Sequence, residues 1–117
     1  MHRVTVDRTA AVPVVLARGE LDAYSAPDLD AAFSDVSVET YVVVDLHRVS
    51  FLDSTALGVV VRGVRDVDER GGRALVVLPR GPARRIFEIT TLDSVLPVAE
   101  SRVQALRSLT TEELSGD

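Results

Sequence analysis

The sequence predicts an α/β fold, with a mixed β-sheet of about five strands that opens with a hairpin and about four helices packed against it. Three observations favour this fold. The chain begins with two short valine-rich segments, and strand-like and helix-like patterns then alternate along it. Residues 41–46 (YVVVDL) form a nearly unbroken apolar run, which is typical of a strand covered on both faces. A length of 117 residues with 46% hydrophobic residues suits one domain.

The opening hairpin is predicted from two segments in which valine content and alternation favour extended backbone. They are Arg3 to Asp7 and Val12 to Arg18, with a tight connection at residues 8–10. We expect the second strand to be broken by the glycine-containing segment Gly19 to Asp22.

A helix is predicted after this break. The segment Ser25-Ala26-Pro27-Asp28 offers a serine N-cap, a proline in the first turn and an acid three residues after the serine. Apolar residues then recur at three- and four-residue spacing and give one buried stripe. These residues are Leu29, Ala32, Phe33 and Val36. We expect the helix to end at about Val36.

The second helix has the more informative pattern. After the central strand Tyr41 to Leu46 and a loop at residues 47–53, it is predicted to start at Ser54 or Thr55 and to end at the glycine pair 71–72. At 100° per residue, one face is apolar. It holds Leu57, Val60, Val61, Val64 and Val67. The opposite face holds Val59, Arg62, Asp66 and Arg70. A valine among polar residues predicts that Val59, with Arg62, is exposed for a partner.

The remaining chain predicts two more strands and two more helices. We expect strands at Ala74 to Leu78 and Val95 to Ala99, and helices at Pro82 to Ile89 and Ser101 to Leu109. A single domain would thus cover residues 1–109, and residues 110–117 would form a frayed acidic tail.

Composition excludes several kinds of chemistry. Cysteine is absent, which removes disulfides, thiolate catalysis and cysteine metal sites. Every basic residue is arginine, so no lysine can bind phosphate in a P-loop or form a Schiff base. His2 and His47 are the only imidazoles. The net charge of −5 and the dispersed arginines argue against direct nucleic-acid binding. The pair Arg84-Arg85 fits the polar face of an amphipathic helix better than a phosphate site.

Location and solubility follow from what the sequence lacks. The first ten residues have no apolar stretch of the signal-peptide kind, and no segment approaches the roughly 20 apolar residues that span a bilayer. We therefore expect a soluble cytoplasmic protein that does not contact a membrane.

The segment Val49 to Gly58 is the strongest candidate site, because it carries hydroxyl residues from a strand end into a helix start, where α/β folds place their sites. In the structural interpretation, Asp53 or Ser54 only caps the helix. In the functional interpretation, Ser54 accepts a phosphoryl group, since backbone N–H groups and the helix dipole accommodate an anion there. The two interpretations are compatible.

Two catalytic alternatives start from the same segment. Convergence of Asp22, Asp45 and Asp53 would make an acidic magnesium pocket like that of a receiver domain, or of a small phosphatase. Receiver domains need a lysine, and the chain has none. A serine hydrolase would need His47 within reach of Ser54, and no G-x-S-x-G elbow surrounds this serine.

The motifs together resemble the STAS-domain anti-sigma factor antagonists. The family signature is an aspartate, a phosphorylated serine, another hydroxyl residue, a small residue, leucine and glycine, which matches Asp53 to Gly58 here. The similarity extends to residues 19–27 and 85–92, so it covers nearly the whole chain. Ala56 and Thr91 stand where the family often has glycine. Alanine is harmless in a first helical turn, whereas Thr91 affects the end of the third helix.

The resemblance implies a switch protein and not an enzyme, with no cofactor and no bound metal. It implies that the unphosphorylated chain binds an anti-sigma factor, a serine/threonine kinase of histidine-kinase-like ATPase fold that uses Mg-ATP, and so frees a sigma factor. Phosphorylation of Ser54 would end this binding, and a serine phosphatase would reset the switch. Such partner switching regulates transcription in stress response and sporulation. The alternative is a STAS scaffolding subunit that is never phosphorylated. The partner-binding residues expected are Asp22, Tyr24, Ser25, Asp53, Thr55, Val59 and Arg62.

Overall fold

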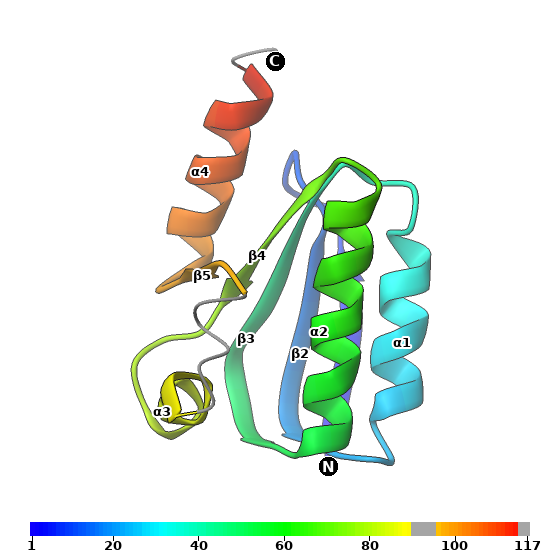
Figure 1. The fold of residues 1–117 in the computed structure, drawn as a ribbon, viewed down its shortest axis with the longest axis vertical. Helices are drawn as coiled ribbons and strands as arrows, with labels where there is room; N and C mark the ends of the chain where they lie inside the picture. Colours follow the sequence, from blue (N-terminus) through cyan, green and yellow to red (C-terminus); the bar gives the residue numbers. More distant parts are fainter. Residues whose placement is uncertain (90–95, 115–117) are drawn as a thin grey trace.

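The computed structural model describes residues 1–89 and 96–114, which form five strands and four helices (Figure 1). The hairpin, the five-stranded sheet and the four helices predicted from the sequence are confirmed. In chain order the elements are β1 (His2–Asp7), β2 (Val14–Leu21), α1 (Ala26–Asp35), β3 (Tyr41–Leu52), α2 (Ser54–Glu69), β4 (Arg73–Val77), α3 (Pro82–Ile89), β5 (Val98–Ala99) and α4 (Arg102–Leu114).

The sheet keeps its strands in sequence order, β1-β2-β3-β4-β5. Strands β1 and β2 are antiparallel, as a hairpin requires, and the pairs β2·β3, β3·β4 and β4·β5 are parallel. Parallel neighbours need a crossover, and α1 and α2 supply the first two crossovers. The carboxyl ends of β2 and β3 therefore meet at one edge of the sheet, where Leu21 pairs with Leu52.

The two faces of the sheet are covered unequally. Helices α1 and α2 lie side by side over one face (Figure 1), and Phe87 of α3 joins the same core cluster. Helix α4 packs on the other face through Ala105 and Leu109. Alternate residues of β3 divide between these layers, with Val42 in the first cluster and Val43 in the second. The apolar run in β3 is thus explained by burial on both faces.

Three element boundaries predicted from the sequence are wrong. Strand β2 continues through Gly19 to Leu21, because Gly19 adopts a φ of 85° at a register irregularity instead of ending the strand. Strand β3 continues to Leu52 through the segment expected to be a loop. Helix α4 extends to Leu114, beyond the expected end at Leu109. Residues 115–117 of the expected tail, and Val95 and Thr91, lie outside the described residues.

The expectation that Val59 is exposed is also wrong, because its side chain is only 5% exposed and belongs to the main core. Helix α2 packs against α1 as well as against the sheet. Gly63, one turn after Val59, lies so close to Phe33 of α1 that a Cβ there would come within 2.5 Å of the ring. The buried face of α2 is therefore wider than the apolar face predicted from the sequence, because its side toward α1 is also buried. Val59 lies within this wider buried face.

Candidate functional site

Ser54 is the first residue of α2, and its side chain is exposed. The preceding residue, Asp53, is the N-cap, and its carboxylate accepts a hydrogen bond from the Ala56 N–H at 2.9 Å. The Leu57 N–H donates to the Asp53 carbonyl, also at 2.9 Å. The cap is therefore made by Asp53, and the Ser54 hydroxyl group is available for other chemistry.

Backbone N–H groups at the start of α2 could donate hydrogen bonds to an anion. Helix N-termini leave their first N–H groups without intrahelical acceptors. The Ala56 N–H is taken by Asp53, and no acceptor in the described part of the chain is recorded for the N–H groups of Ser54 and Thr55. These two groups and the positive end of the helix dipole would face a phosphate on Ser54.

The loop after β2 lies next to this helix start, because the Asp53 N–H donates to the Leu21 carbonyl at 3.0 Å. The Asp22 carboxylate accepts from the N–H groups of Tyr24 and Ser25 at 2.9 and 3.2 Å, which closes a tight turn. The Ser25 hydroxyl accepts from the Asp22 N–H at 2.7 Å and makes no side-chain cap. Ser25 is fully buried, so the expectation that it contacts a partner directly is wrong.

Two aromatic side chains are exposed at the same edge. Tyr24, in the loop after β2, is 90% exposed, and Phe51, three residues before Ser54, is 53% exposed. The sequence reasoning missed Phe51, because it assigned the segment to a loop. We call the exposed or half-exposed residues at this edge the carboxyl-edge surface. It comprises Asp22, Tyr24, Phe51, Asp53, Ser54 and Thr55.

Arg62 extends this surface along α2. Ser54, Gly58 and Arg62 are spaced four residues apart and so share one side of the helix. An Arg62 guanidinium nitrogen lies 3.5 Å from the position that a Cβ on Gly58 would occupy. The Arg62 guanidinium therefore lies back over the turn that holds Gly58, toward the start of the helix.

The acidic magnesium pocket is not formed. Asp22 and Asp53 lie at the carboxyl edge, but Asp45 lies within β3, eight residues before Asp53. At about 3.3 Å per strand residue, this separation is on the order of 25 Å. For the same reason His47, also in β3, is far from Ser54 and cannot act as its base. Within the residues described, no group of three or more potential metal-ligating side chains occurs.

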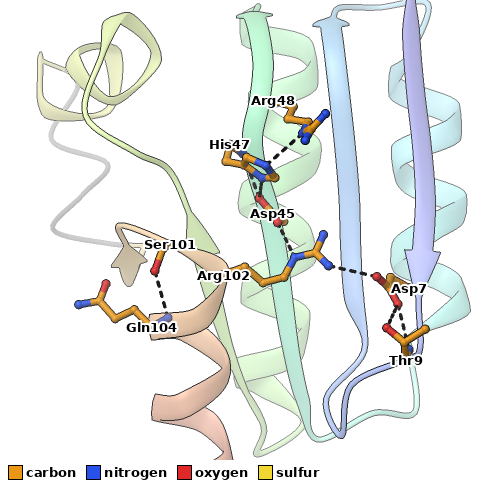
Figure 2. Close-up of polar contacts among 8 residues, drawn as sticks. All are labelled: Asp7, Thr9, Asp45, His47, Arg48, Ser101, Arg102 and Gln104. Atoms are coloured by element: carbon orange, nitrogen blue, oxygen red, sulfur yellow. Dashed lines mark hydrogen bonds and ion pairs between the residues drawn. The ribbon is translucent and has the colours of Figure 1, made fainter.

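Asp45 instead belongs to a polar cluster on the α4 face of the sheet (Figure 2). Its buried carboxylate accepts from Arg102 Nε at 2.8 Å and from the His47 N–H at 3.0 Å, and it lies 2.5 Å from His47 Nδ1. Arg102 also donates to Asp7 at 3.0 Å. Burial raises the pKa of Asp45, but the hydrogen bonds from His47 and Arg102 together lower it below its usual value.

The same contacts shift the pKa values of the two groups around Asp45. Hydrogen bonds from Thr9, and then from Arg102, lower the pKa of Asp7. Burial lowers the pKa of Arg102, but its bonds to Asp45 and Asp7 raise it overall. Asp7, Asp45 and Arg102 are therefore ionised at neutral pH, and their ion pairs tie the start of α4 to β1 and β3.

Two other sequence-based expectations can be compared with the structure. Arg84 does not lie simply on the polar face of α3, because it is half-buried and donates to the Leu78 carbonyl at 2.9 Å, whereas Arg85 is exposed. None of the helices in the described part of the chain is long and apolar enough to cross a membrane.

Comparison with known proteins gives the family. The model of the STAS domain matches residues 3–105. An anti-sigma-B factor antagonist from Listeria monocytogenes is 33% identical over 86 residues, covering 72% of this chain and 75% of the relative. The chain belongs to the STAS-domain family of anti-sigma factor antagonists. A second relative, the anti-sigma F factor antagonist of Paenibacillus polymyxa, is 25% identical over 92% of this chain and 94% of its own length. The crystal structure of a Mycobacterium paratuberculosis anti-sigma factor antagonist has a TM-score of 0.82 and 28% identity, with coverage of 92% and 93%.

Proposed function

We propose that this chain is a cytoplasmic anti-sigma factor antagonist whose carboxyl-edge surface binds an anti-sigma factor, and that phosphorylation of Ser54 ends the binding. The partner is a serine/threonine kinase of histidine-kinase-like ATPase fold that uses Mg-ATP, and a serine phosphatase restores the binding form. One observation carries the proposal. Ser54 is exposed at the first position of α2, directly after an aspartate that already caps the helix.

Exposed aromatic residues support the binding role of this edge. Tyr24, in the loop after β2, and Phe51, near the end of β3, present large apolar side chains to solvent at the edge where α2 begins with Ser54. Aromatic residues at the centre of an interface commonly provide most of its binding energy. Tyr24→Ala and Phe51→Ala should each weaken binding to the anti-sigma factor by at least tenfold, equivalent to about 1.4 kcal/mol, without lowering thermal stability.

Local electrostatics explains how phosphorylation would block binding. A phosphate adds roughly −1.5 to −2 charges at pH 7, one residue from the Asp53 carboxylate. In the free protein, water, the first-turn N–H groups and Arg62 offset this charge. A docked partner would remove the water, and a penalty of about 3 kcal/mol would reduce affinity more than a hundredfold. No refolding of the domain is required.

The test is to incubate the protein with a candidate anti-sigma factor kinase and Mg-ATP and to map phosphate by mass spectrometry. We expect phosphate on Ser54, none on the Ser54→Ala protein, and unchanged modification of the matched control Thr55→Ala. Phosphate on Thr55 in the Ser54→Ala protein would contradict the assignment. Constitutive partner binding without any phosphorylation would instead identify a scaffolding STAS subunit.

Amide NMR spectra of the two forms test the local mechanism. We expect phosphorylation to change signals near residues 50–62 and to leave the sheet and the distant helices unchanged. Shifts spread across β1, β4 and α4 would show a conformational switch and would refute the electrostatic account.

A further inference from the structure

Three arginines stand in register across three neighbouring strands. Arg3 of β1 pairs with Arg18 of β2, and Arg18 pairs with Arg48 of β3. All three side chains are exposed. Like charges directly opposite each other on neighbouring strands are destabilising, so packing and stability do not account for this row. The row is also unusual in a chain whose net charge is −5.

The arginine row lies on the part of the sheet that α4 leaves uncovered. Arg3, Arg18 and Arg48 line one hollow of about 430 Å³, together with Thr5, Leu16, His47 and Arg102. Leu16 packs against the core cluster under α4, which identifies the face. The same three arginines also line an adjoining hollow of about 550 Å³ with Met1, His2 and Gly19. The row therefore forms the shared floor of a shallow groove.

The row keeps its positive charge. Among the residues that the structure describes, no acidic partner is recorded for Arg3, Arg18 or Arg48. Arg48 Nε donates to His47 Nε2 at 3.2 Å, and an imidazole ring carries no negative charge that would offset the guanidinium. Arg102 is held between Asp45 and Asp7. The three arginines of the row and Arg102 carry four positive charges, and the carboxylates of Asp7 and Asp45 carry two negative charges. A net charge of two positive units therefore remains beside the groove.

We propose that this groove binds a small phosphate-bearing anion and prefers diphosphate to a single phosphate. Guanidinium groups bind phosphate oxygens through paired hydrogen bonds. Two strand spacings of about 4.8 Å separate the backbones of Arg3 and Arg48, so one phosphate cannot engage the whole row, whereas a diphosphate engages more of it. The hollows have the size of small-molecule sites, and apart from Leu16 and Met1 they lack the apolar anchors on which protein interfaces depend.

The experiment titrates the intact protein with inorganic pyrophosphate and with inorganic phosphate at constant ionic strength, by calorimetry and amide NMR. Saturable pyrophosphate binding, tighter than phosphate binding and with shifts centred on Arg3, Arg18 and Arg48, is expected. Arg18→Gln should weaken pyrophosphate binding about tenfold, because charge-assisted hydrogen bonds are lost. The matched control Arg65→Gln removes an exposed arginine on α2, across the sheet, and should leave binding unchanged.

Stability measurements separate a binding role from a structural one. Without ligand and at low salt, Arg18→Gln should melt at the same temperature as the wild type or higher, because like-charge repulsion is relieved. If Arg18→Gln fails to fold, Arg3→Gln at the end of the row provides the same comparison. Ser54→Ala should bind pyrophosphate normally, which separates this site from the switch. The proposal is overturned if pyrophosphate binding is not saturable, if Arg18→Gln and Arg3→Gln leave it unchanged, or if an aspartate-rich peptide binds the row more tightly.

Discussion

Replacing Arg102 by methionine tests the polar cluster most directly. The change keeps a long side chain at the start of α4 but removes the cation from the buried Asp45 carboxylate, 2.8 Å away. Breaking a buried ion pair by removing one partner costs about 3 to 5 kcal/mol. Because the Arg102 side chain is 29% exposed, we expect the lower end, about 3 kcal/mol. At about 4 °C per kcal/mol for a domain of this size, the melting temperature should fall by about 12 °C.

The pH dependence gives a sharper signature of the same change. In the wild type, Asp45 and Asp7 have lowered pKa values, so their contribution to stability is present above the unfolded pKa of about 4 and is lost as the pH falls below it. Without Arg102, we expect burial, the largest single influence on this carboxyl group, to outweigh the remaining bonds from His47 and to raise the pKa of Asp45. The Arg102→Met protein should therefore become more stable as the pH falls from 7 toward 5, whereas its stability would not change over this range if Asp45 kept a low pKa.

A double-mutant cycle assigns the effect to Asp45. Urea unfolding at pH 5 and pH 7 is compared for the wild type, Arg102→Met, Asp45→Asn and the double variant. We expect the double variant to be more stable than Arg102→Met at pH 7 and to lose the gain on acidification. A loss below 1 kcal/mol for Arg102→Met, or an unchanged pH slope, would refute the reasoning.

Three further substitutions test the start of α2 and its packing against α1. Asp53→Ala removes the cap of α2 and should cost about 1 kcal/mol in chemical unfolding, and an unchanged midpoint would mean that the Ala56 N–H bond is dispensable. Val59→Asp places a charge in the core and should cost about 3 to 5 kcal/mol, whereas a wild-type melting temperature would show that Val59 is accessible after all. Gly63→Ala should cost about 1 to 3 kcal/mol through its clash with Phe33. Its matched control, Gly58→Ala, faces only ordinary contact with Arg62 and should be neutral or slightly stabilising in thermal melts, so equal losses at both glycines would point to a backbone effect.

Local sequence signals predict the element order of this fold well, because each strand and helix has its own period. These local signals fail where the exposure of a residue depends on another element that packs against its own strand or helix. The second half of β3 is polar because α4 covers only part of that face, so His47 and Arg48 resemble a loop although they are in a strand. Val59 is buried by α1, a helix that the periodicity of α2 alone does not reveal.

The candidate site shows the same division between local and long-range information. The positions of Asp53 and Ser54 follow from capping chemistry, which acts within four residues. A motif does not specify the direction in which a side chain points. For this reason it does not reveal that Ser25 is buried, that the ring of Phe51 is exposed, or that the Arg62 guanidinium lies over Gly58. The bond between Arg102 and Asp45 joins residues 57 positions apart, and no pattern in the sequence indicates it.

That bond has a consequence for how the chain matures on the ribosome. Asp7 and Asp45 are synthesised early, but the arginine that neutralises both is 95 residues after the first and 57 after the second. Until residue 102 leaves the exit tunnel, a nascent sheet that had closed around Asp45 would hold a carboxylate without its cation. The sheet face around Asp45 is therefore buried only when α4 packs on it, and the same helix brings Arg102. Folding should thus be one cooperative event that joins β1 and β3 with α4, elements that lie far apart in the sequence.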